Sequence, residues 1–82
     1  MSTYHYVYIL VSESDPKYHY TGHTEDLSSR LSSHNAGQVP HTSKHRPWRI
    51  ETAIAFHSPE KAMAFEKYLK THSGRAFASK HF

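Results

Sequence analysis

The sequence predicts an α+β fold, in which a small, mainly antiparallel sheet of three strands is flanked by helices. Two observations predict it. Three stretches are rich in β-branched and aromatic residues, and two stretches with helical spacing of apolar residues follow the second and the third of them. The expected element order is β-β-α-β-α, and a further helix at the C-terminus is possible. Because 82 residues are few for more than one domain, we expect a single domain over residues 1–82.

The first two strands are expected to form a hairpin. Residues 4–11 (YHYVYILV) contain neither glycine nor proline and are rich in aromatic and β-branched side chains, which is typical of a strand. Turn-forming residues fill 12–17, and residues 17–21 alternate into a second strand that Gly22 is expected to end. The short connection indicates antiparallel pairing.

A first helix is expected next. Thr24 is the expected N-cap, because its hydroxyl can accept a hydrogen bond from an unpaired amide of the first turn. Acidic residues follow it, where negative charge suits the helix dipole. Leu27 and Leu31 form one apolar stripe, and Gly37 is expected to close the helix in a left-handed conformation.

The remaining elements follow the same logic. Residues 37–47 carry glycine, two prolines and no periodicity, so we expect a loop, whereas residues 48–56 alternate like a strand. Ser58 before a proline is a strong N-cap signal for a helix over residues 59–71. Gly74 is expected to stop this helix, leaving the last eight residues as a short helix or a docked tail.

Composition excludes several classes of protein. The chain contains no cysteine, so disulfides and zinc–thiolate sites are excluded, and its nine histidines match no zinc-site spacing. No apolar run approaches the ~18–20 residues of a membrane span, and the N-terminal residues lack the pattern of a secretory signal. We therefore expect a cytoplasmic protein without a membrane partner.

Basic residues are concentrated in the second half of the chain. The formal net charge is +3, and from residue 40 onward eight lysines and arginines stand against three acidic residues. Such a surplus is compatible with a polyanionic partner, although it is also ordinary for a soluble protein. The residues that we expect to contact nucleic acid are Lys44, Arg46, Arg49, Lys67, Lys70 and Arg75.

Arg30 and His34 are the first candidates for chemistry. Four residues apart on a helix, they share one face. An arginine fork suits phosphate oxygens, and histidine is suited to proton transfer near neutral pH. Spacing alone equally describes an ordinary solvated helix face in a histidine-rich chain.

Glu66 is the candidate metal ligand. It borders the apolar stripe of the second predicted helix, and Mg²⁺ takes only one or two carboxylates while keeping several waters. The alternative is a structural ion pair with Lys70, four residues later, worth a few tenths of a kcal/mol.

Four tyrosines fall on the predicted hairpin. Alternation places Tyr6 and Tyr8 on one face of the first strand, and Tyr18 and Tyr20 on one face of the second. Aromatic packing across the hairpin contributes up to ~1 kcal/mol per pair, and we prefer this explanation for Tyr6 and Tyr18.

Taken together, these residues resemble the signature of the GIY-YIG nuclease superfamily, in particular its small single-domain bacterial members. These members are related to the N-terminal nuclease module of the excinuclease C subunit. The resemblance covers nearly the whole chain. It is carried, in order, by Tyr6-Val7-Tyr8, Tyr20-Thr21-Gly22, Arg30, His34-Asn35, Gly37, Thr42, Arg46-Pro47-Trp48, and Ala62 through Glu66 to Lys70.

The resemblance implies cleavage of a DNA phosphodiester bond with one divalent ion, Mg²⁺ or Mn²⁺, on branched or damaged DNA among other substrates. It implies that Tyr8 orients or deprotonates the attacking water with help from His34, and that Tyr20 contacts the phosphate or the water. Arg30 is then expected to neutralise the developing charge and Glu66 to hold the metal. A free tyrosine has a pKa near ~10, so Tyr8 needs help from its neighbours to act as a base.

The sequence departs from the family pattern in three places. Tyr6 stands where the family name has glycine, and Thr21 where it has isoleucine, but the tyrosines that carry the roles are kept. The asparagine that follows the catalytic glutamate in many members has no counterpart, since Asn35 is the last asparagine of the chain. A nucleic-acid-binding or adaptor module with weak or no turnover is therefore the alternative, with specificity supplied by a protein partner or a homodimer. Burial of Tyr8 and Tyr20 would favour a plain interaction protein.

Overall fold

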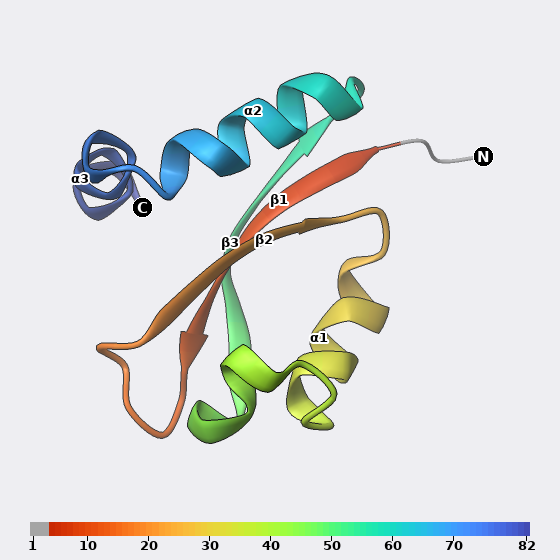
Figure 1. Cartoon of the computed structure of the whole chain (residues 1–82), viewed down its shortest axis with the longest axis vertical. Coiled ribbons are helices and arrows are strands. Elements are labelled where there is room, and N and C mark those ends of the chain that lie inside the picture. Colours follow the sequence, from red (N-terminus) through yellow and green to blue (C-terminus); the bar gives the residue numbers. More distant parts are fainter. Residues whose placement is uncertain (1–3) are drawn as a thin grey trace.

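A three-stranded antiparallel sheet divides the domain into two layers of helices. The computed structural model describes residues 4–82. Strands β1 (His5–Ser12), β2 (His19–Thr24) and β3 (Trp48–Phe56) are arranged in the order β2-β1-β3. Helix α1 (Leu27–Asn35) lies on one side of the sheet, and helices α2 (Pro59–Leu69) and α3 (His72–His81) lie on the other (Figure 1). The predicted α+β class and the strand count are confirmed.

Alternation along β1 produces a separate apolar cluster on each face of the sheet. On one face, Val7 and Ile9 pack with residues of α2, whereas Tyr8 and Leu10 on the other face pack with Trp48. The partly buried members of the second cluster, Tyr20, Leu27, Leu31 and Ile50, extend it to α1 and to both edge strands. The two layers of helices are therefore held by different sets of side chains. Within residues 4–82, no helix is long and apolar enough to cross a lipid bilayer.

Strand β2 is shifted relative to the prediction. It begins at His19 and continues past Gly22 to Thr24, so the expectation that Gly22 ends it was wrong. Gly22 is paired with Tyr8 of β1, and a Cβ atom at this position would lie 2.6 Å from the Tyr8 hydroxyl oxygen. The glycine is therefore part of the strand, because its missing side chain leaves room for the phenol of Tyr8. Tyr18 lies before the strand and stacks on His45 with ring centroids 3.8 Å apart, not across the hairpin.

Helix α1 begins two residues later than predicted. The N-cap is Asp26, whose Oδ1 accepts from the amide of Ser29 at 3.0 Å, whereas Thr24 ends β2 and its Oγ1 accepts from the amide of Asp26 at 3.1 Å. Aspartate and threonine are both good caps, so local preference could not decide between them. At the other end, Gly37 has φ +79° and closes the helix as predicted.

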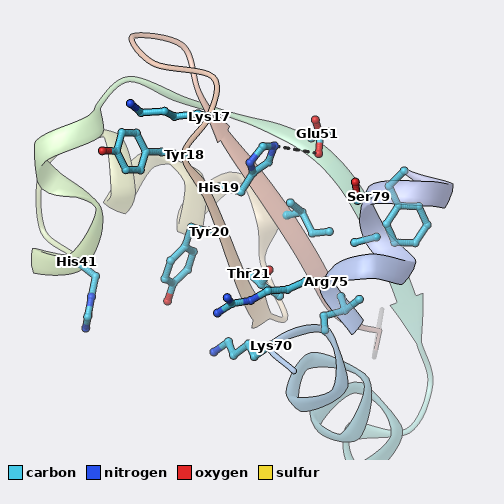
Figure 2. Close-up of a pocket in the computed structure, with 14 residues that line it drawn as sticks. Lys17, Tyr18, His19, Tyr20, Thr21, His41, Glu51, Lys70, Arg75 and Ser79 are labelled. Atoms are coloured by element: carbon cyan, nitrogen blue, oxygen red, sulfur yellow. Dashed lines mark ion pairs between the residues drawn. The ribbon is translucent and has the colours of Figure 1, made fainter. Parts of the chain in front are cut away.

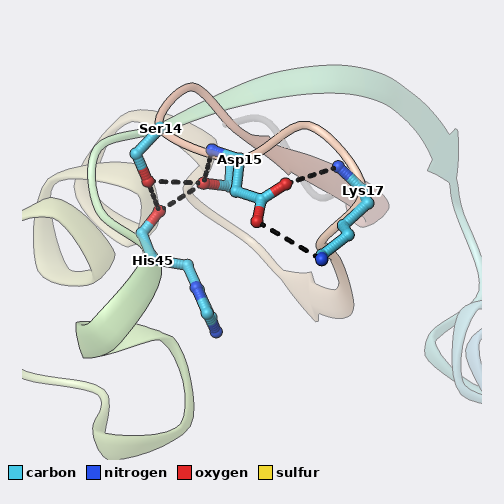
Figure 3. A network of polar contacts seen from close by, with 5 residues as sticks. Ser14, Asp15, Lys17 and His45 are labelled. Carbon is cyan, nitrogen blue, oxygen red and sulfur yellow. Dashed lines mark hydrogen bonds and ion pairs between the residues drawn. The ribbon is translucent and has the colours of Figure 1, made fainter.

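The segment predicted as a loop contains a 3-10 helix, η1 (Pro40–His45). The backbone carbonyl of His45 accepts hydrogen bonds from the hydroxyls of Ser12 at 2.6 Å and Ser14 at 3.5 Å (Figure 3). Asp15 donates its amide to Ser12 Oγ at 3.1 Å and forms an ion pair with Lys17 at 3.8 Å. These contacts fix the end of η1 to the turn between β1 and β2.

The C-terminal residues form a full helix, α3. Ser58 caps α2 as predicted, accepting from the amide of Lys61 at 3.2 Å. Gly74, however, lies inside α3, which Thr71 caps by accepting from the Gly74 amide at 3.0 Å. A side chain at Gly74 would collide with the backbone of Tyr68. This glycine therefore permits close packing of two helices and does not stop one.

Candidate active site

The centre of the candidate site is a hydrogen bond between Tyr8 and His34. The Tyr8 hydroxyl and Nε2 of His34 are 3.0 Å apart. Tyr8 comes from the middle of β1 and is 2% exposed, and His34 comes from the last turn of α1 and is fully buried. The Tyr20 ring, half-buried on β2, lies 4.9 Å from the His34 ring and 6.4 Å from the Tyr8 ring between centroids. The structure thus brings these three predicted site residues together on the α1 face.

Arg30 completes this group. It precedes His34 by one helical turn on α1, and the interaction of its guanidinium with the Tyr8 hydroxyl raises the pKa of the arginine above its ordinary value. Arg30 therefore stays charged at any pH of interest. It places a permanent positive charge beside the two tyrosines.

Burial and charge set the protonation states of the central pair. Burial raises the pKa of Tyr8, although the nearby guanidinium of Arg30 works in the opposite direction. Burial also lowers the pKa of His34, and the Arg30 charge lowers it further. At neutral pH Tyr8 therefore keeps its proton, and His34 is neutral and able to accept one.

The buried His34 predicts how stability depends on pH. Its pKa lies below 6.5 in the folded domain, so between that lowered pKa and 6.5 the unfolded chain binds a proton that the folded chain does not bind. The free energy of unfolding should therefore fall as the pH drops below 6.5. Urea unfolding across this interval measures the fall, and it should be smaller for His34→Gln. An NMR titration midpoint for His34 at or above 6.5 would contradict this prediction.

Glu66 approaches from the other side of the sheet. Its Oε1 accepts from Nδ1 of His23 at 2.6 Å, and its Oε2 accepts from Nζ of Lys70 at 2.9 Å. The expected pair with Lys70 is therefore present, but it is not the only contact of the carboxylate. Because His23 lies on the edge strand β2, Glu66 reaches the rim of the sheet, and its negative charge contributes to raising the pKa of Tyr8.

The environment of Glu66 keeps it ionised. Burial raises its pKa, but the hydrogen bonds from Lys70 and His23 outweigh burial and lower it below the ordinary value. Among residues 4–82, no group of three or more histidines, cysteines or acidic residues could enclose a metal ion. A single ionised carboxylate fits a hydrated Mg²⁺, which keeps most of its ligands as water or substrate oxygens. Such an ion would have to displace or share the contacts of Lys70 and His23.

Sequence patterns alone did not predict two residues of this site, His23 and Thr42. His23 was not recognised because β2 was predicted to end at Gly22; a longer strand would have placed His23 on the α2 face beside its partner Val7. Thr42, whose Oγ1 lies 2.8 Å from Nδ1 of His34, sits in η1, where local sequence gave no signal of a contact. In the sequence, Thr42 stands out only as part of the family pattern.

The predicted nucleic-acid contacts do not form one surface. An open groove of about 820 Å³ runs along β2 and α3, and of the predicted residues Lys70 and Arg75 line it (Figure 2). Its other charged or ionisable side chains are Lys17, His19, His41 and Glu51, and the rings of Tyr18 and Tyr20 also line it.

The four other predicted contacts lie outside the groove. Arg46 donates from Nε to the carbonyl of Ser43 at 2.9 Å, and Arg49 faces Glu13 at 4.0 Å. Lys44 and Lys67 are exposed on η1 and α2. Lys17, the third groove lysine or arginine, was not predicted because the tertiary fold, and not local sequence, brings β2 and α3 together.

A sequence model of the GIY-YIG catalytic domain matches residues 4–80. The chain belongs to the GIY-YIG family. Among similar curated proteins, UPF0213 protein BH0048 of Halalkalibacterium halodurans is 39% identical over 72 residues, which are 87% of this chain and 74% of the relative. UPF0213 protein SH2523 of Staphylococcus haemolyticus is 36% identical over 70 residues, covering 84% of this chain and 83% of the relative.

A solved structure of a relative has a similar fold. The solution NMR structure of UPF0213 protein BH0048 from Bacillus halodurans matches this domain with a TM-score of 0.57 and 32% identity. The match covers 94% of this chain and 83% of the other. The resemblance seen in the sequence is therefore confirmed, and a nuclease-like function follows from the family; the names of the relatives state no activity.

Proposed function

We propose that this GIY-YIG domain is a metal-dependent endonuclease that hydrolyses DNA phosphodiester bonds in repair or processing. The observation that carries the proposal is the hydrogen bond of 3.0 Å between Tyr8 and a neutral His34, beside the permanent charge of Arg30. Phosphodiester hydrolysis needs an activated water and a positive group near the developing charge. In this cluster, Tyr8 and His34 offer a route for the proton of the water, and Arg30 offers the positive charge.

The proton path follows from the geometry. Tyr8 passes its hydroxyl proton to Nε2 of His34 and takes a proton from the attacking water, so that the water oxygen can bond to phosphorus as the bond to the leaving oxygen breaks. The leaving oxygen takes up a proton from solvent. Arg30 stabilises the negative charge on the phosphoryl oxygens, and Tyr20 contacts the phosphate or the water. A divalent ion, Mg²⁺ or Mn²⁺, held by Glu66 would supply further positive charge at the phosphate.

The groove along β2 suits the backbone of a DNA substrate. Lys70 and Arg75 line it together with Lys17, and Tyr20 belongs both to the groove and to the candidate site. Positive side chains that follow a groove bind phosphates and make binding sensitive to salt. We propose that DNA enters along this groove, with Lys44, Arg46, Arg49 and Lys67 as outer contacts.

A double variant tests the proposal. Wild-type protein with Mg²⁺ or Mn²⁺ should cut plasmid or branched DNA, and Arg30→Ala combined with Glu66→Ala should lower the rate by at least about 10²-fold, the cost of losing one charge-stabilising group. Glu60→Ala with Lys80→Ala removes the same two charges from exposed helix positions and should keep the wild-type rate. Equal trace activity in the wild type and the first variant would end the enzyme proposal.

One observation favours a second candidate, a nucleic-acid-binding or adaptor module without efficient turnover. Tyr8 is 2% exposed, and both oxygens of Glu66 already have partners, so a substrate must displace existing contacts. For a plain interaction protein the two tyrosines disagree: the burial of Tyr8 favours it, whereas Tyr20 lines the open groove and counts against it. For the binding module, DNA affinity should fall steeply with salt while no variant changes a cleavage rate. A protein partner or a second copy of the chain would then supply the specificity.

A further inference from the structure

Thr42 is buried at the back of the candidate site and touches His34. Its Oγ1 lies 2.8 Å from Nδ1 of His34, on the side of the ring opposite Tyr8, and 3.2 Å from the carbonyl oxygen of Val39. We propose that Thr42 is a positioning residue that fixes the tautomer of His34, with the proton on Nδ1 and the lone pair of Nε2 facing the Tyr8 hydroxyl. Its effect on catalysis rests on the proposed nuclease function, whereas the tautomer itself does not.

The hydroxyl of Thr42 has one hydrogen, which it donates in a hydrogen bond to the Val39 carbonyl. A carbonyl oxygen can only accept, so the contact between Thr42 Oγ1 and Val39 requires the threonine to donate. Toward His34 the same oxygen is then left with its lone pairs. Nδ1 of His34 must therefore carry a hydrogen to form the contact of 2.8 Å.

The Tyr8 side of the ring leads to the same tautomer. The phenol is buried, so its hydrogen needs an acceptor. The Arg30 guanidinium, which also acts on this hydroxyl, can only donate. Nε2 of His34, at 3.0 Å, is thus the group that accepts the Tyr8 hydrogen, which requires a bare Nε2. The two ends of the imidazole agree on one tautomer.

Thr42 is itself held in place by its surroundings. The indole Nε1 of Trp48 donates to the Thr42 carbonyl at 2.8 Å. Asn35 in turn binds the Trp48 backbone twice, accepting from its amide at 2.6 Å and donating to its carbonyl at 3.0 Å. At the far end of η1, the carbonyl of His45 is fixed by Ser12. Residues on α1, β1 and β3 therefore determine where the Thr42 hydroxyl points.

This arrangement places a third group behind a proton acceptor, as in sites where a base is oriented by a neighbour. A hydroxyl differs from a carboxylate in that it brings no negative charge and so orients the ring without opposing the lowered pKa of His34. When His34 takes the proton of Tyr8 on Nε2, its Nδ1 hydrogen still faces the lone pairs of Thr42. The orienting contact is therefore the same before and after proton transfer.

NMR of the histidine ring nitrogens tests the tautomer without any need for activity. Protonated and bare ring nitrogens have well-separated ¹⁵N shifts, and the signals that disappear in His34→Gln belong to His34. In the ¹⁵N-labelled wild type we expect one neutral tautomer, with hydrogen on Nδ1. Thr42→Val, which keeps the shape but loses the hydroxyl, should introduce a population protonated on Nε2, and Thr42→Ser should keep the wild-type pattern. A wild-type ring protonated on Nε2 overturns the proposal, even if Thr42→Val does not fold.

Kinetics separate positioning from a purely structural role. A general base contributes about 10²–10⁴-fold to a rate, so partial loss of its orientation should lower kcat about 10-fold or more in Thr42→Val with KM unchanged. Thr42→Ser should recover most of the rate. A Thr42→Val protein that folds and keeps both the Nδ1 tautomer and the wild-type kcat overturns the proposal. If the ring signals behave as expected but no protein cuts DNA, the tautomer assignment stands and the proposed nuclease function fails.

Discussion

Tyr8→Phe is expected to lower the rate of DNA cleavage by about 10²–10⁴-fold while leaving DNA affinity nearly unchanged, because it removes the hydroxyl that we propose exchanges protons between the attacking water and His34. The ring that packs with Leu10 and Trp48 is retained, so the fold should survive. Nε2 of His34 loses its partner, which costs about 1–3 kcal/mol of stability. Single-turnover cleavage and a parallel binding titration measure the two effects separately.

Tyr6→Phe is the matched control for this experiment. Tyr6 lies on the same strand two residues earlier and, in the described structure, its ring neighbours Tyr4 at 6.3 Å and not the site. It should keep the wild-type rate. If Tyr8→Phe also cuts DNA at the wild-type rate, the phenol takes no part in moving protons, and the water must be activated by another group.

Glu66→Gln is expected to lower the cleavage rate by about 10²–10³-fold, because the neutral amide cannot hold a divalent ion against water. The dependence of the remaining rate on Mg²⁺ concentration should weaken as well. A second readout is independent of activity: Mn²⁺ should broaden the NMR signals of His23 and of neighbouring amides in the wild type, and do so less in the variant.

Glu60→Gln is the control on the same helix. Glu60 is exposed in the first turn of α2, where it accepts a hydrogen bond of 3.1 Å from the hydroxyl of Ser58. It lies far from Tyr8 and Tyr20 in the sequence. Its replacement should change neither the rate nor the broadening. Equal Mn²⁺ broadening around residue 66 in wild type and Glu66→Gln would show that the ion binds elsewhere.

The sequence contained enough information for the main arrangement of the fold. Hydrophobic alternation predicts the strands because one face of a strand must be buried, and the spacing of Arg30 and His34 predicts one shared helix face. Both are local consequences of periodicity. The convergence of these residues on Tyr8 needed the family resemblance, and the structure supplies the contact itself. The catalytic and metal roles stay predictions.

The two errors at glycines have a common physical cause. Gly22 and Gly74 were both read as ends of elements, since glycine often ends strands and helices. Each glycine instead makes room for a neighbouring group from another element. Gly22 leaves space for the phenol of Tyr8 on β1, and Gly74 leaves space for the backbone of Tyr68 on α2. Such close approaches are tertiary facts, which local preferences do not contain. The same holds for His23 and Thr42, whose partners lie 43 and 8 residues away.

The sheet that separates the two apolar clusters also separates the two chemical tasks of the site. Tyr8, Arg30 and His34 depend on the packing of α1, whereas Glu66 depends on the packing of α2, and the two groups meet only around the edge strand β2. Local opening of a protein usually involves one packed unit at a time. A brief departure of α2 from the sheet would thus withdraw Glu66, the proposed metal ligand, while the hydrogen-bonded pair of Tyr8 and His34 stayed assembled. The proposed cleavage therefore requires the α1 side and the α2 side of the site to be in place together, and either side can be lost without the other.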